Sequence, residues 1–316
     1  MLRYIGYICA PGFLMMNGAM VWWVYHKRIS KGSTDWNARW HLIQRGLFLV
    51  LVQITWVNSS WGGFSAFKPA HLGIISTIGI SMLFLTLIIK LKWHLRLGIA
   101  LAILFTYPIF LQIVYNPNVL WQQVLMQTFV DAGEFNKYPV LPWFALAILG
   151  SVMATGWLKA WKTEKQKIIY SMAIGAASIC IAVLIRMDRG FGNIFPFSEI
   201  GSFSFFLDQK YPPSLYHNLW FFGLVVLGIG IIIIINKSFP KLLNVLSIVG
   251  KVPLFFYCIH LAILGILSKR IGLFYRQGEV VDTLIGFSIM LIIMLPLAKW
   301  FGGVKQRSKN YFIKMI

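Results

Sequence analysis

The segment SLYHNLWFFGLVVLGIGIIIIIN, residues 214–236, decides the fold class. It contains no Asp, Glu, Lys or Arg, and its second half is an almost unbroken run of Ile, Val, Leu and Gly. A helix needs about 20 mostly apolar residues to cross the hydrocarbon core of a bilayer. The segment therefore predicts a transmembrane helix.

Eight further apolar runs lie along the 316 residues. Hydrophobic residues make up 58% of the chain and charged residues only 12%, which excludes an ordinary soluble domain. No soluble domain fits between the runs, so we expect one integral membrane domain over residues 1–316, an all-α polytopic bundle of about nine transmembrane helices. The other runs cover approximately 4–25, 42–58, 70–91, 95–115, 138–158, 168–186, 250–267 and 281–300.

Basic residues outnumber acidic ones, 29 Lys and Arg against 9 Asp and Glu, which gives a net charge of +20. A basic chain raises the question of a nucleic-acid partner. Most of these Lys and Arg lie in alternate loops, however, and the opposite loops hold all the acids except Asp35 and Glu164. This positive-inside bias predicts a multi-pass protein of the cytoplasmic (inner) membrane with an external N-terminus and a cytoplasmic C-terminus. We expect no nucleic-acid partner.

Several common chemistries have no signature in this sequence. The three cysteines, Cys9, Cys180 and Cys258, each lie in an apolar run without CxxC or Cys/His spacing, so we expect neither a disulfide framework nor a metal site. There is no GxxxxGK[ST] loop, which argues against an ATP-driven machine. The lack of an internal repeat with broken helices weakens a secondary-transporter interpretation without excluding it.

The long loops, 116–137, 187–213 and 268–280, fall on the predicted outer side and carry acids, aromatics and prolines. Loops of this kind indicate a site. Within the first, LWQQVLMQTF at 120–129 alternates apolar and polar residues at near-helical spacing, which predicts a short helix in the membrane interface. The alternative is a lid packed on the bundle.

Three histidines are candidates for chemistry because ionisable groups at membrane depth are costly. His260 lies in the middle of the run 250–267, whereas His71 and His217 lie near the outer ends of theirs. An imidazole can act as a base or nucleophile near neutral pH. In the alternative, His260 hydrogen-bonds a neighbouring helix and the other two have an interfacial role.

Two arginines near the cytoplasmic start of the second run are candidates for anion binding. Arg45 lies about one turn inside the run, and Arg39 precedes it. Guanidinium groups bind phosphate bidentately, so the pair could hold the phosphates of a nucleotide-bearing donor. Alternatively, Arg45 extends its side chain to the cytoplasmic surface without a ligand.

Five sequence blocks, taken in order, are similar to those of one family. They are APGFLMMNG at 10–18, Arg45-Gly46, YPVLPW at 138–143 followed by Gly150, KYPPSL at 210–215, and GKVPLFFY at 250–257 with His260. This arrangement resembles the bacterial membrane proteins similar to heparan-α-glucosaminide N-acetyltransferase. The resemblance runs from about residue 4 to 300, and the KYPPSL and GKVPLFFY blocks are its specific parts.

The resemblance implies a helical bundle in the lipid bilayer that takes an acetyl group from cytoplasmic acetyl-CoA. It would deliver this group to an extracytoplasmic amino sugar or envelope glycan, without a metal. On this interpretation the site consists of catalytic His260 and His71, donor-binding Arg45 and Arg39, and saccharide-binding Lys210, Tyr211 and His217.

The sequence also departs from the family pattern. Family members begin with a helix bearing an Asp-x-x-Arg-Gly motif, followed by a loop with a histidine thought to carry or activate the acetyl group. This chain starts after both, and the nine-helix arrangement with an external N-terminus agrees with that. We therefore expect either an N-terminally incomplete chain or a shortened relative. In the second case His71 or His260 takes over the role, or catalysis is lost.

Two non-enzymatic alternatives stay open. The first is a transporter or channel that moves a small molecule without acetyl-CoA. The second is a structural membrane subunit whose outer loops bind a partner. A homo-oligomer is compatible with all of these interpretations.

Overall fold

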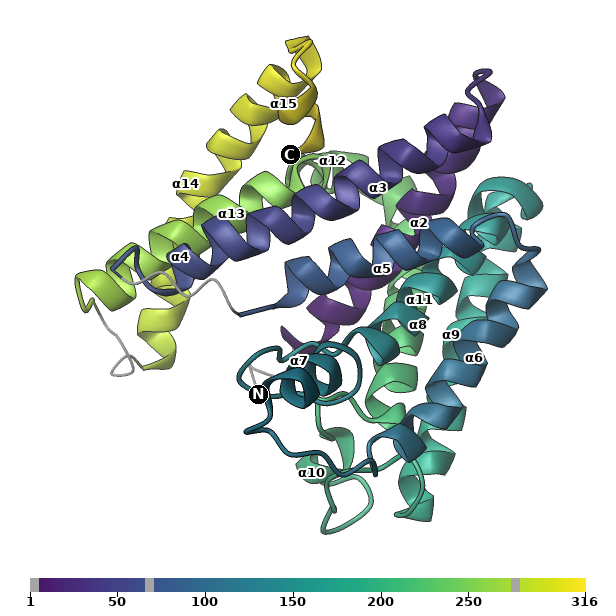
Figure 1. Cartoon of the computed structure of the whole chain (residues 1–316). Coiled ribbons are helices and arrows are strands. Elements are labelled where there is room, and N and C mark those ends of the chain that lie inside the picture. The colour runs from purple at the N-terminus through teal and green to yellow at the C-terminus, as the bar shows by residue number, and fades with distance from the viewer. Residues whose placement is uncertain (1–5, 66–70, 274–278) are drawn as a thin grey trace. The chain divides into compact units, whose positions relative to one another are not determined.

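A computed structural model describes residues 6–65, 71–273 and 279–316. The regular elements in these residues are all helices (Figure 1), so the prediction of an all-α fold is confirmed. The predicted runs that begin at residues 4 and 70, and residues 274–278 of the predicted loop 268–280, lie partly or wholly outside the described residues.

Among the described residues, 8 helical segments are long and apolar enough to cross a membrane. The chain is therefore a multi-pass membrane protein. These segments are η1–α2 (Gly6–Ile8, Cys9–Ser30), α3–η2–α4 (Asp35–Val52, Gln53–Val57, Asn58–Trp61), α6 (Trp93–Phe110), α8–η3 (Val140–Thr155, Gly156–Ala160), α9 (Glu164–Asp188), α11 (Leu215–Ser238), α13–η4 (Pro253–Leu264, Gly265–Arg270) and α14 (Val280–Arg307).

The run predicted over 70–91 forms α5, Ile74–Ile88, an apolar helix of 15 residues. At 1.5 Å per residue it is about 22 Å long, shorter than the hydrocarbon core of a bilayer. The predicted helix at 120–129 is α7, Leu120–Phe129. Three further short helices complete the described set: α10 (Phe203–Phe206), α12 (Pro240–Lys251) and α15 (Tyr311–Met315).

The chain forms two compact units. Unit 1 comprises Met1–Val50 and Leu72–Ile234, and unit 2 comprises Leu51–His71 and Ile235–Ile316. The chain passes from unit 1 to unit 2 inside the long segment that begins with α3. The expectation of one functional domain stays a prediction.

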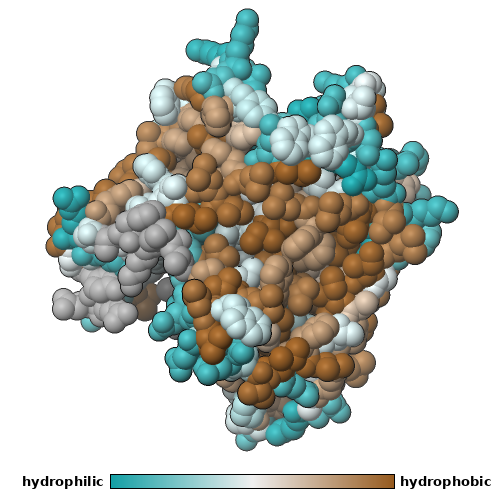
Figure 2. Space-filling view, in the orientation of Figure 1, coloured by the Kyte–Doolittle hydropathy of each residue, from teal (hydrophilic) through white to brown (hydrophobic). Residues whose placement is uncertain are grey.

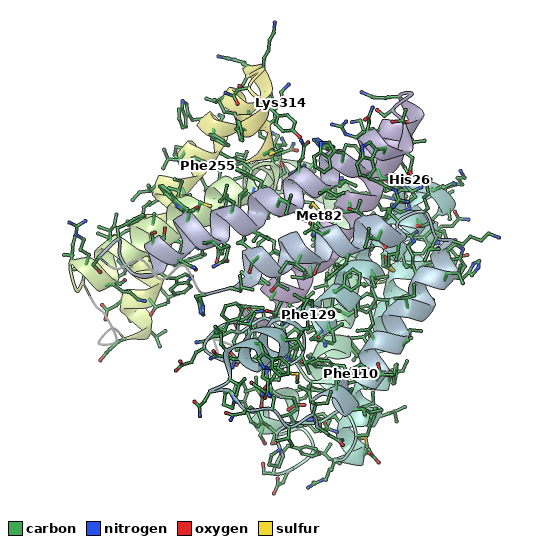
Figure 3. The ribbon with its side chains drawn as sticks, viewed as in Figure 1. His26, Met82, Phe110, Phe129, Phe255 and Lys314 are labelled. Carbon is green, nitrogen blue, oxygen red and sulfur yellow. The ribbon has the colours of Figure 1, made fainter. Side chains whose placement is uncertain are left out.

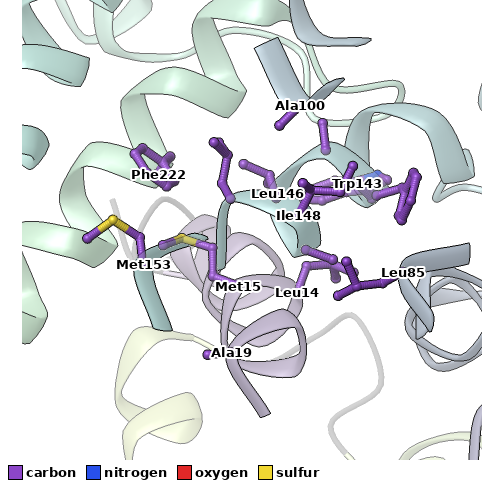
Figure 4. Close-up of a cluster of buried hydrophobic side chains, with 14 of the residues drawn as sticks. Leu14, Met15, Ala19, Leu85, Ala100, Trp143, Leu146, Ile148, Met153 and Phe222 are labelled. Carbon is purple, nitrogen blue, oxygen red and sulfur yellow. The ribbon is translucent and has the colours of Figure 1, made fainter. Parts of the chain in front are cut away.

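Helix α8 is the centre of unit 1. In the most apolar 18-residue stretch of Val140–Ala160, 78% of the residues are buried. The corresponding fraction for α6 is 22%. It packs against α2, α5 and α6. Figure 4 shows Leu14 and Met15 of α2 beside Leu146 and Ile148 of α8, residues that belong to one buried apolar cluster.

Two glycines allow α2 and α8 to approach closely. A Cβ atom added at Gly18 would collide with the backbone of Ala147, and one added at Gly150 would collide with the backbone of Met15. Small residues permit this kind of backbone contact between membrane helices, which gain stability from packing because lipid supplies no hydrophobic drive between helices.

The outward faces of the long helices are apolar as well. Ile109 of α6 is 58% exposed and Leu184 of α9 is 66% exposed. On the face of unit 1 visible in Figure 2, brown apolar side chains form a broad area between hydrophilic helix ends. This pattern fits side chains that contact lipid.

Unit 2 is built around α13. The Trp56 Nε1 atom donates a hydrogen bond to the Cys258 carbonyl at 3.0 Å. Gly265 lies directly against the backbone of Ser60. Helix α14 packs on α12 and α13, and the Phe255 and Phe301 rings stack with centroids 4.1 Å apart.

Candidate functional site

A buried ion pair organises the loop between α9 and α11. Arg186, at the end of α9, is fully buried, and its Nη1 atom lies 3.5 Å from Asp208 Oδ2. The guanidinium also donates to the carbonyls of Phe195 at 2.8 Å and Phe205 at 3.0 Å. Asp208 accepts from the backbone N–H groups of Phe195 at 2.7 Å and Gln209 at 2.8 Å. The residues that follow Asp208 are therefore held in one position.

Beside this ion pair lies a cavity of about 610 Å³ at the N-terminal end of α2. It is called here the outer cavity because the sequence predicts an external N-terminus. It is lined by Gly6, Tyr7, Phe195, Asp208, Gln209, Lys210 and Tyr211. The Lys210 Nζ atom lies 4.8 Å from the Tyr7 ring centre and 5.2 Å from that of Tyr211. The Tyr211 hydroxyl is 2.7 Å from the Tyr138 hydroxyl.

Lys210 is the uncompensated charge of the outer cavity. The Asp208 carboxylate is paired with Arg186, and Lys210 forms no ion pair within the described residues. An ammonium held between tyrosine rings and open to a cavity can bind an anionic or hydroxylated ligand.

His217 belongs to the first turn of α11, and its ring contacts that of Tyr7. Its ring centre is 5.8 Å from that of Tyr7, 4.6 Å from Phe221 and 6.2 Å from Trp143. The residue is fully buried, and within the described residues neither ring nitrogen has a hydrogen-bond partner. The amide nitrogen and oxygen of the adjacent Asn218 are equally buried and unpartnered. Leaving buried polar atoms unpaired costs about 1–3 kcal/mol each, so this cluster calls for a functional explanation.

A second cavity of about 380 Å³ lies at the C-terminal end of α2 and is called here the inner cavity, because the sequence predicts that this end is cytoplasmic. Its lining consists of Val24, Lys27, Arg28, Lys31, Ser33 and His41. In Figure 3 the label of His26 marks this end of α2, and the label of Phe110 marks the other end of unit 1. Helix α2 has 22 residues, which corresponds to about 33 Å and matches the thickness of a hydrocarbon core.

The loop at 116–137 is fixed by tyrosines. The Tyr107 hydroxyl donates to the Val130 carbonyl. The Tyr115 hydroxyl donates to Asp131 Oδ2 at 3.1 Å. Burial, with the nearby Asp131 carboxylate, raises the pKa of Tyr115. Whether α7 lies in a membrane interface stays a prediction.

The three residues predicted to bind a saccharide lie together in unit 1. Lys210 and Tyr211 line the outer cavity, and the His217 ring contacts Tyr7 of the same lining. Sequence reasoning missed Tyr7, because its proximity to residues some 200 positions later is a tertiary effect. The pairing of Arg186 with Asp208, 22 positions later, is likewise a tertiary contact that the sequence does not reveal.

The two histidines predicted to be catalytic line neither cavity, and both belong to unit 2. The Nδ1 atom of His260 lies 2.8 Å from the Phe256 carbonyl of its own helix. The His71 carbonyl accepts a hydrogen bond from Asn58 Nδ2 at 2.8 Å. Their catalytic role stays a prediction.

The predicted donor-binding arginines do not line the inner cavity either. Arg39 is bound to Asp35, with Nε 3.1 Å from Oδ1, and its Nη1 donates to the Thr86 carbonyl at 2.8 Å. The basic residues that do line the inner cavity are Lys27, Arg28, Lys31 and His41. Charge alone could not single them out, because the whole predicted cytoplasmic side is basic.

Within the described residues, no group of three or more His, Cys, Asp or Glu side chains is placed to hold a metal ion. Helices long and apolar enough to cross a membrane, together with a cavity at each end of α2, define the class of protein: a multi-pass membrane protein.

Comparison with known families specifies the class. The family described as heparan-alpha-glucosaminide N-acetyltransferase, catalytic, matches residues 1–185, more than half of the chain. The protein belongs to this family of transmembrane acetyltransferases. The match ends within α9, so the KYPPSL and GKVPLFFY blocks lie beyond it. Comparisons with the curated proteins and with the solved structures gave no match.

Proposed function

We propose that this protein transfers an acetyl group from acetyl-CoA, taken from the cytoplasm, to an amino sugar or envelope glycan outside the cytoplasmic membrane. The observation that carries the proposal is the position of the two cavities at opposite ends of α2, both within unit 1. A transferase whose donor and acceptor approach from different sides needs such an arrangement.

The outer cavity suits a saccharide. The rings of Tyr7, Phe195 and Tyr211 offer apolar faces to a sugar ring, and Gln209 and Lys210 offer polar groups that fix its orientation. Because the Arg186–Asp208 pair holds the loop, little conformational entropy is lost when the acceptor binds.

The chemistry needs a group that removes a proton from the acceptor. When the acceptor nitrogen attacks the acetyl carbonyl carbon, a C–N bond forms, the C–S bond of the thioester breaks, and the thiolate leaves with the electron pair. The nitrogen then loses a proton, and the thiolate gains one. His217 does not line the outer cavity itself, but its ring packs against Tyr7 of the lining, and its two ring nitrogens have no partner within the described residues. We therefore assign this proton transfer to His217. His260 and His71 are tested as alternatives in the same assay.

The first test uses Lys210→Gln in purified protein supplied with labelled acetyl-CoA and glucosamine. We expect the KM for the acceptor to rise about tenfold, because a charge-assisted contact is lost, while kcat changes less. The matched control is Lys269→Gln, which removes another ammonium held over an aromatic ring, that of Trp61 in unit 2. Equal kinetics for the two variants would remove Lys210 from the acceptor site.

A further inference from the structure

Three helices of unit 2 meet at the C-terminal end of α14. One apolar cluster joins them through Ile248 of α12, Phe301 of α14 and Ile313 of α15. In Figure 1 the C-terminus, just after α15, lies beside α12. Helix α12 has 12 residues and α15 has 5, so at about 1.5 Å per residue neither is long enough to cross a bilayer. Residues 239–251 and 299–316 are called here the basic end.

The basic end carries positive charge and no negative charge. Its exposed basic side chains are Lys241, Lys251, Lys299, Arg307, Lys309 and Lys314. Residues 239–251 and 299–316 contain no Asp or Glu. None of the exposed cations forms an ion pair within the described part of the chain. Their mutual repulsion is relieved when an anionic partner lies against this surface.

Large apolar side chains are exposed on the same surface. Phe239, Leu246, Trp300 and Phe312 are each more than half exposed. Tryptophan is enriched at the level of lipid headgroups, and helices that lie in this region bury Phe and Leu side chains at the boundary with the acyl chains. Cations and exposed aromatic rings on helices too short to cross a bilayer are therefore typical of a surface that contacts lipid headgroups.

The positive-inside bias accounts for the sign of the charge but not for the exposed aromatic rings. Residues 159–167 lie on the same predicted side and contain four lysines, but Glu164 lies among them, and the Trp161 ring packs on Trp157 with centroids 6.5 Å apart. A soluble anion would use only the cations of the basic end. An anionic lipid uses the cations through its headgroup and the apolar side chains through its acyl chains.

We propose that the basic end binds anionic lipids. Arg307, Lys309 and Lys314 contact the headgroup phosphates, and Trp300 and Phe312 lie between the headgroups and the acyl chains. Clusters of about four to eight Lys and Arg beside a transmembrane helix recognise anionic lipid surfaces in this way. The proposal does not depend on acetyl transfer, because lipid binding is measured without substrate.

Hydrogen exchange measures lipid contact locally in α15. The backbone N–H group of Lys314 donates to the Asn310 carbonyl at 3.3 Å, and that of Ile316 donates to the Phe312 carbonyl at 3.3 Å. A helix as short as α15 opens easily by itself, so contact with lipid should slow the exchange of these two amides. Full-length protein is compared in nanodiscs of neutral phosphatidylcholine and in nanodiscs that also contain phosphatidylglycerol.

Three triple variants separate the effect of charge from that of folding. The neutral variant is Arg307→Gln/Lys309→Gln/Lys314→Gln. The charge-retaining variant is Arg307→Lys/Lys309→Arg/Lys314→Arg. The matched control, Lys159→Gln/Lys162→Gln/Lys165→Gln, removes three exposed lysines of the same predicted side in unit 1. Thermal unfolding of each variant confirms that it is folded.

In the parent protein we expect phosphatidylglycerol to slow exchange of the α15 amides about threefold or more. The charge-retaining variant and the lysine control should keep this slowing, and the neutral variant should lose it. Equal exchange in the two kinds of nanodisc would overturn the proposal. Undiminished slowing in the neutral variant, or the same loss in the lysine control, would also overturn it.

Discussion

At the scale of single residues, Arg186 and His217 show two ways of burying a polar group. Arg186 is surrounded by acceptors that take up its donors and by the Asp208 carboxylate, whereas both nitrogens of His217 are without partners in the described residues. The first arrangement fixes the shape of a loop. The second costs stability, and the proposed proton transfer would give this cost a function.

Replacing Arg186 with Ala should destabilise the protein by about 3–5 kcal/mol, because Asp208 would remain buried without a counter-ion. The midpoint of denaturant unfolding in detergent measures this change. Arg189→Ala is the control. Both guanidinium groups lie over the Phe197 ring, Arg186 at 4.9 Å and Arg189 at 4.3 Å, but Arg189 is exposed. Its loss should change the free energy of unfolding by no more than about 0.5 kcal/mol. Similar midpoints for the two variants would show that the buried pair does not organise the loop.

Replacing His217 with Phe should abolish acetyl transfer while leaving stability unchanged or raised by about 1 kcal/mol, because no hydrogen bond is lost and two unpaired nitrogens disappear. Transfer activity and thermal unfolding are measured on the same preparation. His260→Phe and His71→Phe serve as comparisons. If either of these two lost activity while His217→Phe kept it, the proton transfer would belong to unit 2.

At the scale of elements, the close approach of α2 and α8 holds unit 1 together. Replacing Gly18 with Leu should therefore destabilise the protein by about 3 kcal/mol or more, because the side chain would meet the backbone of Ala147. Gly98→Ala in α6 is the matched control, since nothing lies within 4 Å of the added Cβ. This control should be neutral or stabilising by up to about 1 kcal/mol. The midpoints of denaturant unfolding measure both changes in stability. A Gly18→Leu variant as stable as the parent protein would contradict the close contact between α2 and α8.

Most elements could be predicted because membrane helices are set by the length and polarity of apolar runs. Helix α7 begins and ends at the predicted residues, 120 and 129. The π-helical turns Gln53–Val57 and Gly156–Ala160 carried no signal, since they depend on local packing rather than composition. Helix α5 is shorter than its apolar run indicated.

At the scale of the whole molecule, sequence located one half of the candidate site better than the other. Lys210 and Tyr211 stand out in the KYPPSL block, and the structure adds Tyr7, which lies about 200 positions earlier in the sequence but lines the same cavity. The inner cavity was hidden by the general basic character of its side. A single sequence does not show which of its many lysines come together around one cavity, because this depends on how the helices pack.

The central claim is acetyl transfer between two sides of a membrane, and it is tested most directly in sealed proteoliposomes. Labelled acetyl-CoA is enclosed in the vesicles, glucosamine is supplied only outside, and a second preparation reverses this. The account predicts labelled N-acetylglucosamine on the acceptor side, formed only when acetyl-CoA is on the opposite side and lost with His217→Phe. Movement of unmodified glucosamine without acetyl-CoA, or the absence of any acetylated product, would contradict it.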